Sequence, residues 1–107
     1  QNKIDQIFKT NYDSQILLTQ KLLKKKLINR NASLVYISSL SSFLGVAGTL
    51  LYASSKAALN SAVRVLATEL APQAIRVNSI CPGIVKTEML KGTNIDEEIL
   101  NLKEQIF

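Results

Sequence analysis

Three stretches decide the fold of this chain: LVYISS at residues 34–39, LLYASSKAAL at residues 50–59, and AIRVNSI at residues 74–80. The first is a short apolar run ending in serines, which is typical of a strand buried on both faces. The second opens a helix that we expect to run from Leu50 to Leu70, because Pro72 stops it. The third is a second strand. Strand, helix and strand in this order predict a parallel pair joined by a right-handed crossover.

A long helix is expected ahead of the first strand, over residues 3–29. Its apolar side chains recur at three- and four-residue spacing, at Ile4, Ile7, Phe8, Tyr12, Leu18, Leu22 and Leu23. Asn11 lies on or beside this stripe, where a polar side chain needs a partner. The spacing leaves open whether Asn11 is a satisfied core residue or a site residue. Beyond the second strand, residues 87–90 predict a short helical turn and residues 95–106 an amphipathic helix.

The composition predicts one small domain of ordinary globular character. Its 107 residues are 47% apolar and 20% charged, and its apolar stretches are too short to span a bilayer. The single cysteine, Cys81, cannot form an internal disulfide, which suits a reducing compartment and a cytoplasmic location. The sequence has no histidine, so neither histidine triads nor a histidine or cysteine-rich metal site is expected.

The net charge of +5 arises largely from a basic cluster that comprises Lys21, Lys24, Lys25, Lys26 and Arg30. Such a cluster can bind nucleic acid or anionic lipid, or it can be a solvated helix end where cations complement the dipole. No aromatic residues interleave with these cations, so stacking platforms for bases are missing. We therefore expect neither a nucleic-acid nor a membrane partner.

Tyr52 and Lys56 stand one helical turn apart, and Ser39 follows the first strand. A phenol is a poor base at neutral pH, but an adjacent ammonium favours the phenolate. A serine hydroxyl can hold a substrate oxygen nearby. Because ligands bind beyond the carboxyl ends of parallel strands, these three residues should gather at one sheet edge with Pro82 and Gly83. Together they can move a proton to or from a carbonyl or alcohol oxygen.

The segment Tyr52-Ala53-Ser54-Ser55-Lys56, with Ser39 and Thr10-Asn11 upstream and the run from Ile75 to Thr87 downstream, resembles the short-chain dehydrogenase/reductase family. The resemblance implies an α/β fold with a doubly wound, Rossmann-like parallel sheet in three α/β/α layers. Residues 1–107 would form a partial domain that holds its catalytic portion. The four glycines include no phosphate-binding array, so the N-terminal nucleotide-binding half is expected to be absent from this sequence.

The resemblance also implies site roles. Tyr52 would be the general acid/base, Lys56 would favour its phenolate and bind the nicotinamide ribose, and Ser39 would polarise the substrate oxygen. Asn11 would hold a water in a proton relay that reaches Lys56. The nicotinamide pocket would be shaped by Pro82, Gly83, Val85 and Thr87. The cofactor would be NAD or NADP, and the substrate a ketone or secondary alcohol, with a 3-oxoacyl thioester as a reasonable subtype.

In this family the helices that carry Asn11 and Tyr52 commonly form a subunit interface, which implies a homodimer or homotetramer. A face of small residues at Ala53, Ala57 and Ser61 fits such a contact, although it also fits packing within one chain. An alternative is a non-catalytic module that pairs helices and lacks hydride transfer. A third interpretation, nucleic-acid binding through the basic cluster, predicts salt-sensitive affinity that depends on Lys24, Lys25 and Lys26.

Overall fold

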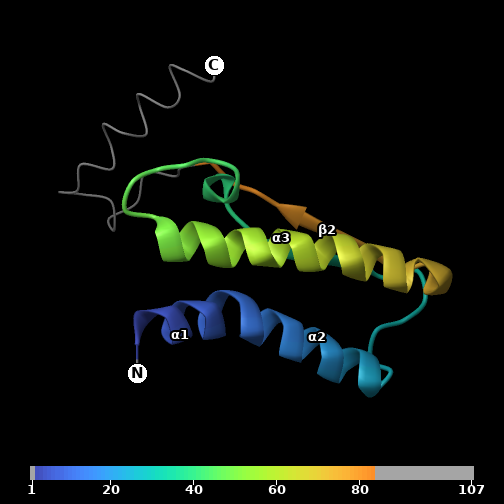
Figure 1. Cartoon of the computed structure of the whole chain (residues 1–107). Helices are drawn as coiled ribbons and strands as arrows, with labels where there is room; N and C mark the ends of the chain where they lie inside the picture. The colour runs from blue at the N-terminus through green and yellow to red at the C-terminus, as the bar shows by residue number, and fades with distance from the viewer. Residues whose placement is uncertain (1, 84–107) are drawn as a thin grey trace.

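The computed structural model describes residues 2–83, and all statements on structure concern these residues. Strands β1 (Ser33–Ile37) and β2 (Arg76–Ile80) pair in parallel, with Ser33 opposite Arg76 and Ile37 opposite Ile80. Helix α3 (Leu50–Leu70) connects them, as the sequence predicts. The helical run that contains α1 and α2 lies beside α3 and points in the same direction (Figure 1). The expected elements at residues 87–90 and 95–106 lie outside the described residues.

The first helical run has three parts: α1 (Lys3–Phe8), a π-helical segment η1 (Lys9–Asp13) and α2 (Ser14–Lys24). Asn2 caps α1, because its Oδ1 accepts a hydrogen bond from Asp5 N at 2.9 Å. The prediction of one continuous helix to residue 29 was wrong at its end. Lys26 adopts a left-handed φ of 56°, and its N donates to Leu23 O at 3.0 Å. Leu27 N donates to Leu22 O at 2.9 Å, which completes a Schellman motif.

Strand β1 is covered on one face only. Tyr36 points into the core and is buried, whereas Val35 and Ile37 are 53% and 57% exposed. The expectation of burial on both faces was therefore wrong for the described residues. The reason is that both neighbouring helices pack against the same face of the sheet, which leaves alternate side chains of the strand uncovered.

The core lies between α3 and the covered face of the sheet. Its buried apolar side chains are Tyr36, Leu59, Val63, Leu70, Ile75 and Val77. The first helical run joins this core through Thr19 on α2, whose hydroxyl shares a hydrogen bond with the Tyr36 hydroxyl. Both residues are buried, and because the Thr19 hydroxyl also donates to Gln15 O at 2.8 Å, this bond supplies the partner of the Tyr36 hydroxyl.

A short 3-10 turn, η3 (Ala71–Gln73), follows α3 and contains the proline that the sequence marks as the helix stop. Ala74 then takes a left-handed φ of 57°, which turns the chain back toward β1. For this reason β2 begins at Arg76, two residues later than the alternating pattern predicts. The second strand still places Ile75 and Val77 in the core, as their alternation indicates.

Candidate active site at the carboxyl end of the sheet

The first two turns of α3 bring a phenol and an ammonium together. Lys56 Nζ lies 5.8 Å from the centroid of the Tyr52 ring. Tyr52 is 43% exposed, so this residue is accessible at the surface of the described part of the chain. The four-residue spacing in a helix puts both side chains on one face, as the sequence predicts. This pair is the chemical centre of the candidate site.

Lys56 is anchored to the end of β1. Its Nζ donates a hydrogen bond to Ile37 O at 3.0 Å, and Ser38 Oγ donates to Lys56 O at 3.3 Å. The lysine therefore has the partner that a cation beside an apolar stripe requires. An ammonium has three protons, so two remain to bind other acceptors. The contact also fixes the start of α3 against the carboxyl end of the strand.

Ser39 follows β1 at this same end. It caps a short 3-10 turn, η2 (Leu40–Ser42), and its Oγ accepts a hydrogen bond from Ser41 N at 3.1 Å. The serine acts only as an acceptor in this contact, which leaves its own proton to donate. Its position two residues after Ile37 places a hydroxyl donor in the loop beyond the Lys56 anchor.

The loops after the two strands are joined to each other. Ser38 N donates to Ile80 O at 2.7 Å, and Leu40 N donates to Pro82 O at 3.0 Å. Pro82 and Gly83 thus lie at the same sheet end as Ser39, as predicted from the parallel topology. No atom of the described residues lies within 4 Å of a Cβ built on Gly83. The other two residues proposed for this pocket, Val85 and Thr87, lie outside the described residues.

Asn11 lies in the π-helical segment and reaches across to α3. Its Nδ2 donates to Ser55 Oγ at 3.1 Å, and Ser55 Oγ donates to Tyr52 O at 2.8 Å. Asn11 is therefore a satisfied polar residue that contacts the helix of Tyr52 and Lys56. Ser55 directly precedes Lys56 in the sequence, so this contact places Asn11 beside the candidate site.

Ser55 and Asn60 were not singled out from the sequence. Both are buried polar residues of α3, at 0% and 6% exposure. Ser55 lies four residues before Leu59 on the buried stripe, so its helical position could have marked it as a polar residue needing a partner. Asn60 lies four residues after Lys56 and three before Val63, so the same spacing could have marked it.

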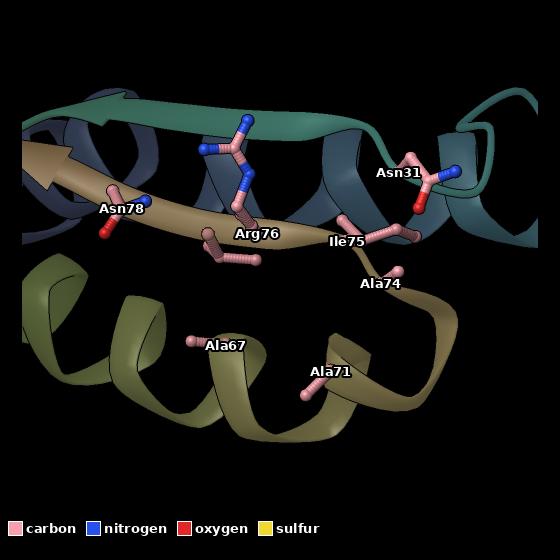
Figure 2. A pocket seen from close by; sticks show the side chains of 8 residues that line it. Asn31, Ala67, Ala71, Ala74, Ile75, Arg76 and Asn78 are labelled. Carbon is pink, nitrogen blue, oxygen red and sulfur yellow. The ribbon is translucent and has the colours of Figure 1, made fainter.

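A hollow of about 770 Å³ in the described residues lies away from this site. It runs between β2 and the last turns of α3, and Figure 2 shows Ala67 and Ala71 of the helix facing the strand. Small alanine side chains leave this space open. The hollow is at the opposite end of α3 from Tyr52, so we do not assign the phenol chemistry to it.

A second hollow, about 420 Å³, lies between η1, α2 and α3. Its lining residues are Tyr12, Ile16, Ala58, Ser61, Ala62, Val65 and Leu66. Of the small residues that the sequence marked for a helix contact, Ser61 lines this hollow and Ala53 and Ala57 do not.

The basic cluster is exposed around the end of α2, where Lys21 and Lys24 occupy the last turn. This is the favourable place for cations near a helix dipole. Residues 2–83 contain no group of three side chains suited to hold a metal ion. No helix in the described part of the chain is both long and apolar enough to cross a membrane.

Comparison with known proteins agrees with this geometry. A family model described as enoyl-(acyl carrier protein) reductase matches residues 1–106. The chain belongs to the short-chain dehydrogenase/reductase family. It is 37% identical over 103 residues to the 3-oxoacyl-[acyl-carrier-protein] reductase of Aquifex aeolicus, covering 95% of this chain and 41% of that protein. It is 39% identical over 101 residues to human dehydrogenase/reductase SDR family member 2, covering 94% of this chain and 36% of the relative.

Solved structures of this family show the same fold. The 3-oxoacyl-[acyl-carrier protein] reductase of Brucella melitensis, in complex with NAD, aligns with a TM-score of 0.77 at 32% identity. That alignment covers 95% of this chain and 41% of the solved chain. A short-chain dehydrogenase family protein of Francisella tularensis aligns with a TM-score of 0.76 at 29% identity, covering 94% and 40%. The short-chain dehydrogenase/reductase chain described here is thus a partial Rossmann-like α/β fold that spans about two fifths of these relatives.

Proposed function

We propose that the polypeptide is a NAD(P)-dependent oxidoreductase that interconverts a ketone and a secondary alcohol, with Tyr52 as general acid/base. One observation carries this proposal. An exposed phenol lies beside an ammonium that is itself anchored at the carboxyl end of a parallel strand. Members of the family named as reductases, and one solved with NAD, support the reaction type.

The chemistry of the site's own residues follows from their protons. In the reducing direction the Tyr52 hydroxyl gives its proton to the carbonyl oxygen, while a hydride adds to the carbonyl carbon. The hydride is supplied by a reduced nicotinamide cofactor when one is bound. The Ser39 hydroxyl donates a hydrogen bond to the same oxygen as it gains negative charge. Lys56 stabilises the phenolate that remains until solvent restores the proton.

The described residues fit the nicotinamide end of such a cofactor. Lys56 has two ammonium protons left beyond its bond to Ile37 O, which suits ribose hydroxyls. Pro82 and Gly83 lie at the same sheet end, and among residues 2–83 no atom stands within 4 Å of a Cβ built on Gly83. We assign Val85 and Thr87 to this pocket as part of the proposal. The glycines of the described residues form no phosphate-binding array.

We assign Asn11 to a proton relay that begins at Lys56. Its side chain amide is engaged by Ser55, and this bond holds the π-helical segment against the first turns of α3. A π-helical segment alters the regular hydrogen-bonding ladder and is frequent at functional sites. A water bound here would return protons to the phenol through the ammonium.

The test is oxidation of NADPH and of NADH by the complete polypeptide that contains this sequence. A panel of small ketones and 3-oxoacyl thioesters is the substrate set, the thioesters because two relatives carry that name. We expect loss of reduced cofactor that requires both enzyme and carbonyl substrate. If both cofactors bind and no carbonyl of the panel is reduced, the proposed enzyme activity is refuted. That outcome favours the alternative, a non-catalytic module that pairs helices.

We also propose that the hollow between η1, α2 and α3 is part of a homodimer or homotetramer contact. Ala58, Ala62 and the half-exposed Val65 line it, and small side chains let a second helix approach closely. Ala62→Arg would place a charge in this contact. We expect the variant to have a lower mass by light scattering than the wild type, with Glu69→Arg as a control outside the hollow. Equal masses for wild type and Ala62→Arg would refute the contact.

A further inference from the structure

We propose that Asn60 is a positioning residue, which sets the place of the Ser39 loop relative to Tyr52 and Lys56. This role rests on the function proposed above. Asn60 lies on α3 one helical turn after Lys56 and is 6% exposed, so it is screened from solvent and does not itself meet a ligand. Its side-chain amide makes hydrogen bonds at both ends. The nitrogen bonds to the loop after β1, and the oxygen bonds to the loop after β2.

The first end of the amide holds the loop after β1. Asn60 Nδ2 donates to Ser42 Oγ at 2.7 Å, and Ser42 Oγ donates to Ser39 O at 2.7 Å. Ser42 N donates to the same carbonyl at 3.0 Å. Two short side-chain bonds therefore connect the backbone of Ser39 to the helix that carries the phenol and the ammonium.

The second end of the amide meets the loop after β2. Cys81 Sγ donates a weak hydrogen bond to Asn60 Oδ1 at 3.9 Å. The next residue, Pro82, accepts from Leu40 N at 3.0 Å, which joins the two loops directly. Asn60, Ser42 and Cys81 thus form one polar cluster between α3 and both strand ends, which we call the loop clamp.

An amide suits this position because it presents a donor and an acceptor in one rigid plane. Leucine has a similar volume and would fill the space, but it would leave Ser42 without its donor. The loop would then keep its backbone contacts and lose the side-chain hydrogen bond that ties Ser42 to the helix. A displacement of about 1 Å at a reacting group can lower the rate about a hundredfold. The clamp is therefore expected to act on turnover through the place of Ser39.

The experiment uses the complete polypeptide, with turnover and amide hydrogen exchange measured on the same variants. For Asn60→Leu and Ser42→Ala we expect kcat/KM to fall about tenfold to a hundredfold. We also expect faster exchange at the Leu40 and Ser42 amides and an unchanged Kd for NADPH. Ser42→Thr keeps the hydroxyl and should recover most of the loss. Two variants are used so that a folding defect in one leaves the other to decide.

Leu70→Ala is the matched control, because it trims a buried side chain ten residues further along α3, away from the three residues of the clamp. It should lower stability and leave kcat/KM per folded molecule unchanged. An active wild type whose Asn60→Leu and Ser42→Ala variants keep normal turnover overturns this role alone. The positioning role is also overturned if Ser42→Thr and Ser42→Ala lose the same amount of kcat/KM. An inactive wild type overturns the proposed function, and the positioning role with it.

Discussion

The two halves of α3 differ in what they contact. In its first half, Ser55, Lys56 and Asn60 make hydrogen bonds to the π-helical segment, the end of β1 and the following loop. In its second half, Val63 and Leu70 are buried in apolar contacts and form no such bonds to the sheet. The same helix thus holds the reactive groups in its first turns and contributes core side chains from Leu59 to Leu70.

This difference separates two properties that often change together. Because burial of apolar side chains dominates folding, the second half should govern the free energy of unfolding. Because oriented polar groups govern chemistry, the first half should govern turnover. A change in one half that mainly affects the property of the other half would refute this division.

In the first half of the helix, a large effect on turnover is expected for Lys56→Ala. Loss of the ammonium removes the charge beside Tyr52 and the bond to Ile37 O. We expect kcat to fall by about a hundredfold or more and the affinity for NADPH to weaken. Steady-state kinetics with cofactor titration measure both. An unchanged pH–rate profile together with unchanged cofactor affinity would contradict the double role of this lysine.

Leu70→Ala tests the second half of the helix. Leu70 is 6% exposed in the core, so truncation should cost about 2–5 kcal/mol of the free energy of unfolding. Turnover per folded molecule should stay close to that of the wild type. Urea denaturation gives the stability, and Val65→Ala, at a side chain that is 54% exposed, is the control. A large loss of kcat with little loss of stability would break the division.

Tyr36→Phe removes a hydroxyl from the core and leaves the ring. It deletes the bond to Thr19 and leaves a buried hydroxyl without that partner. We expect a loss of about 1 kcal/mol in the free energy of unfolding. Turnover should be retained, because this phenol lies within the core. Thr19→Val removes the same bond, so the losses of the two single variants should not add in the double variant, and additive losses would contradict the role given to the bond.

The smallest effect is expected for Ala74→Gly, just beyond the second half of α3. Ala74 holds a left-handed φ of 57°, which is unfavourable for a residue with a Cβ. Glycine relieves this strain but gains freedom in the unfolded chain, so we expect a net stabilisation of about 0.5 kcal/mol. A rise in the midpoint of urea denaturation with unaltered kinetics would fit. A clear destabilisation would show that the backbone there is unstrained.

Much of the fold was predictable from local sequence signals. The apolar spacing and Pro72 gave the bounds of α3, and the order of elements gave the parallel pairing. The end of α2 was missed because Lys26 takes a left-handed conformation without the glycine that usually marks it. The exposed face of β1 was missed because an apolar run does not say which layers cover it.

The candidate site was predictable at Tyr52, Lys56 and Ser39 because their spacing combines with the topology of a crossover. The partners of these residues were less predictable. Lys56 binds a backbone carbonyl, which every residue offers and no sequence pattern marks. The π-helical segment around Asn11 also lacks a sequence signal. The role of Asn60 depends on its hydrogen bond to Ser42, which only the folded loop reveals.

The most direct test of the account is single-turnover reduction of a carbonyl substrate by Tyr52→Phe in the complete polypeptide. Tyr36→Phe serves as the matched control, since it removes the same atom from a phenol that lies in the core. We predict that Tyr52→Phe lowers the rate of cofactor oxidation by about 10²–10⁴-fold with the fold intact, and that Tyr36→Phe stays close to wild type. Near-normal oxidation by Tyr52→Phe would contradict the assignment of the proton donor.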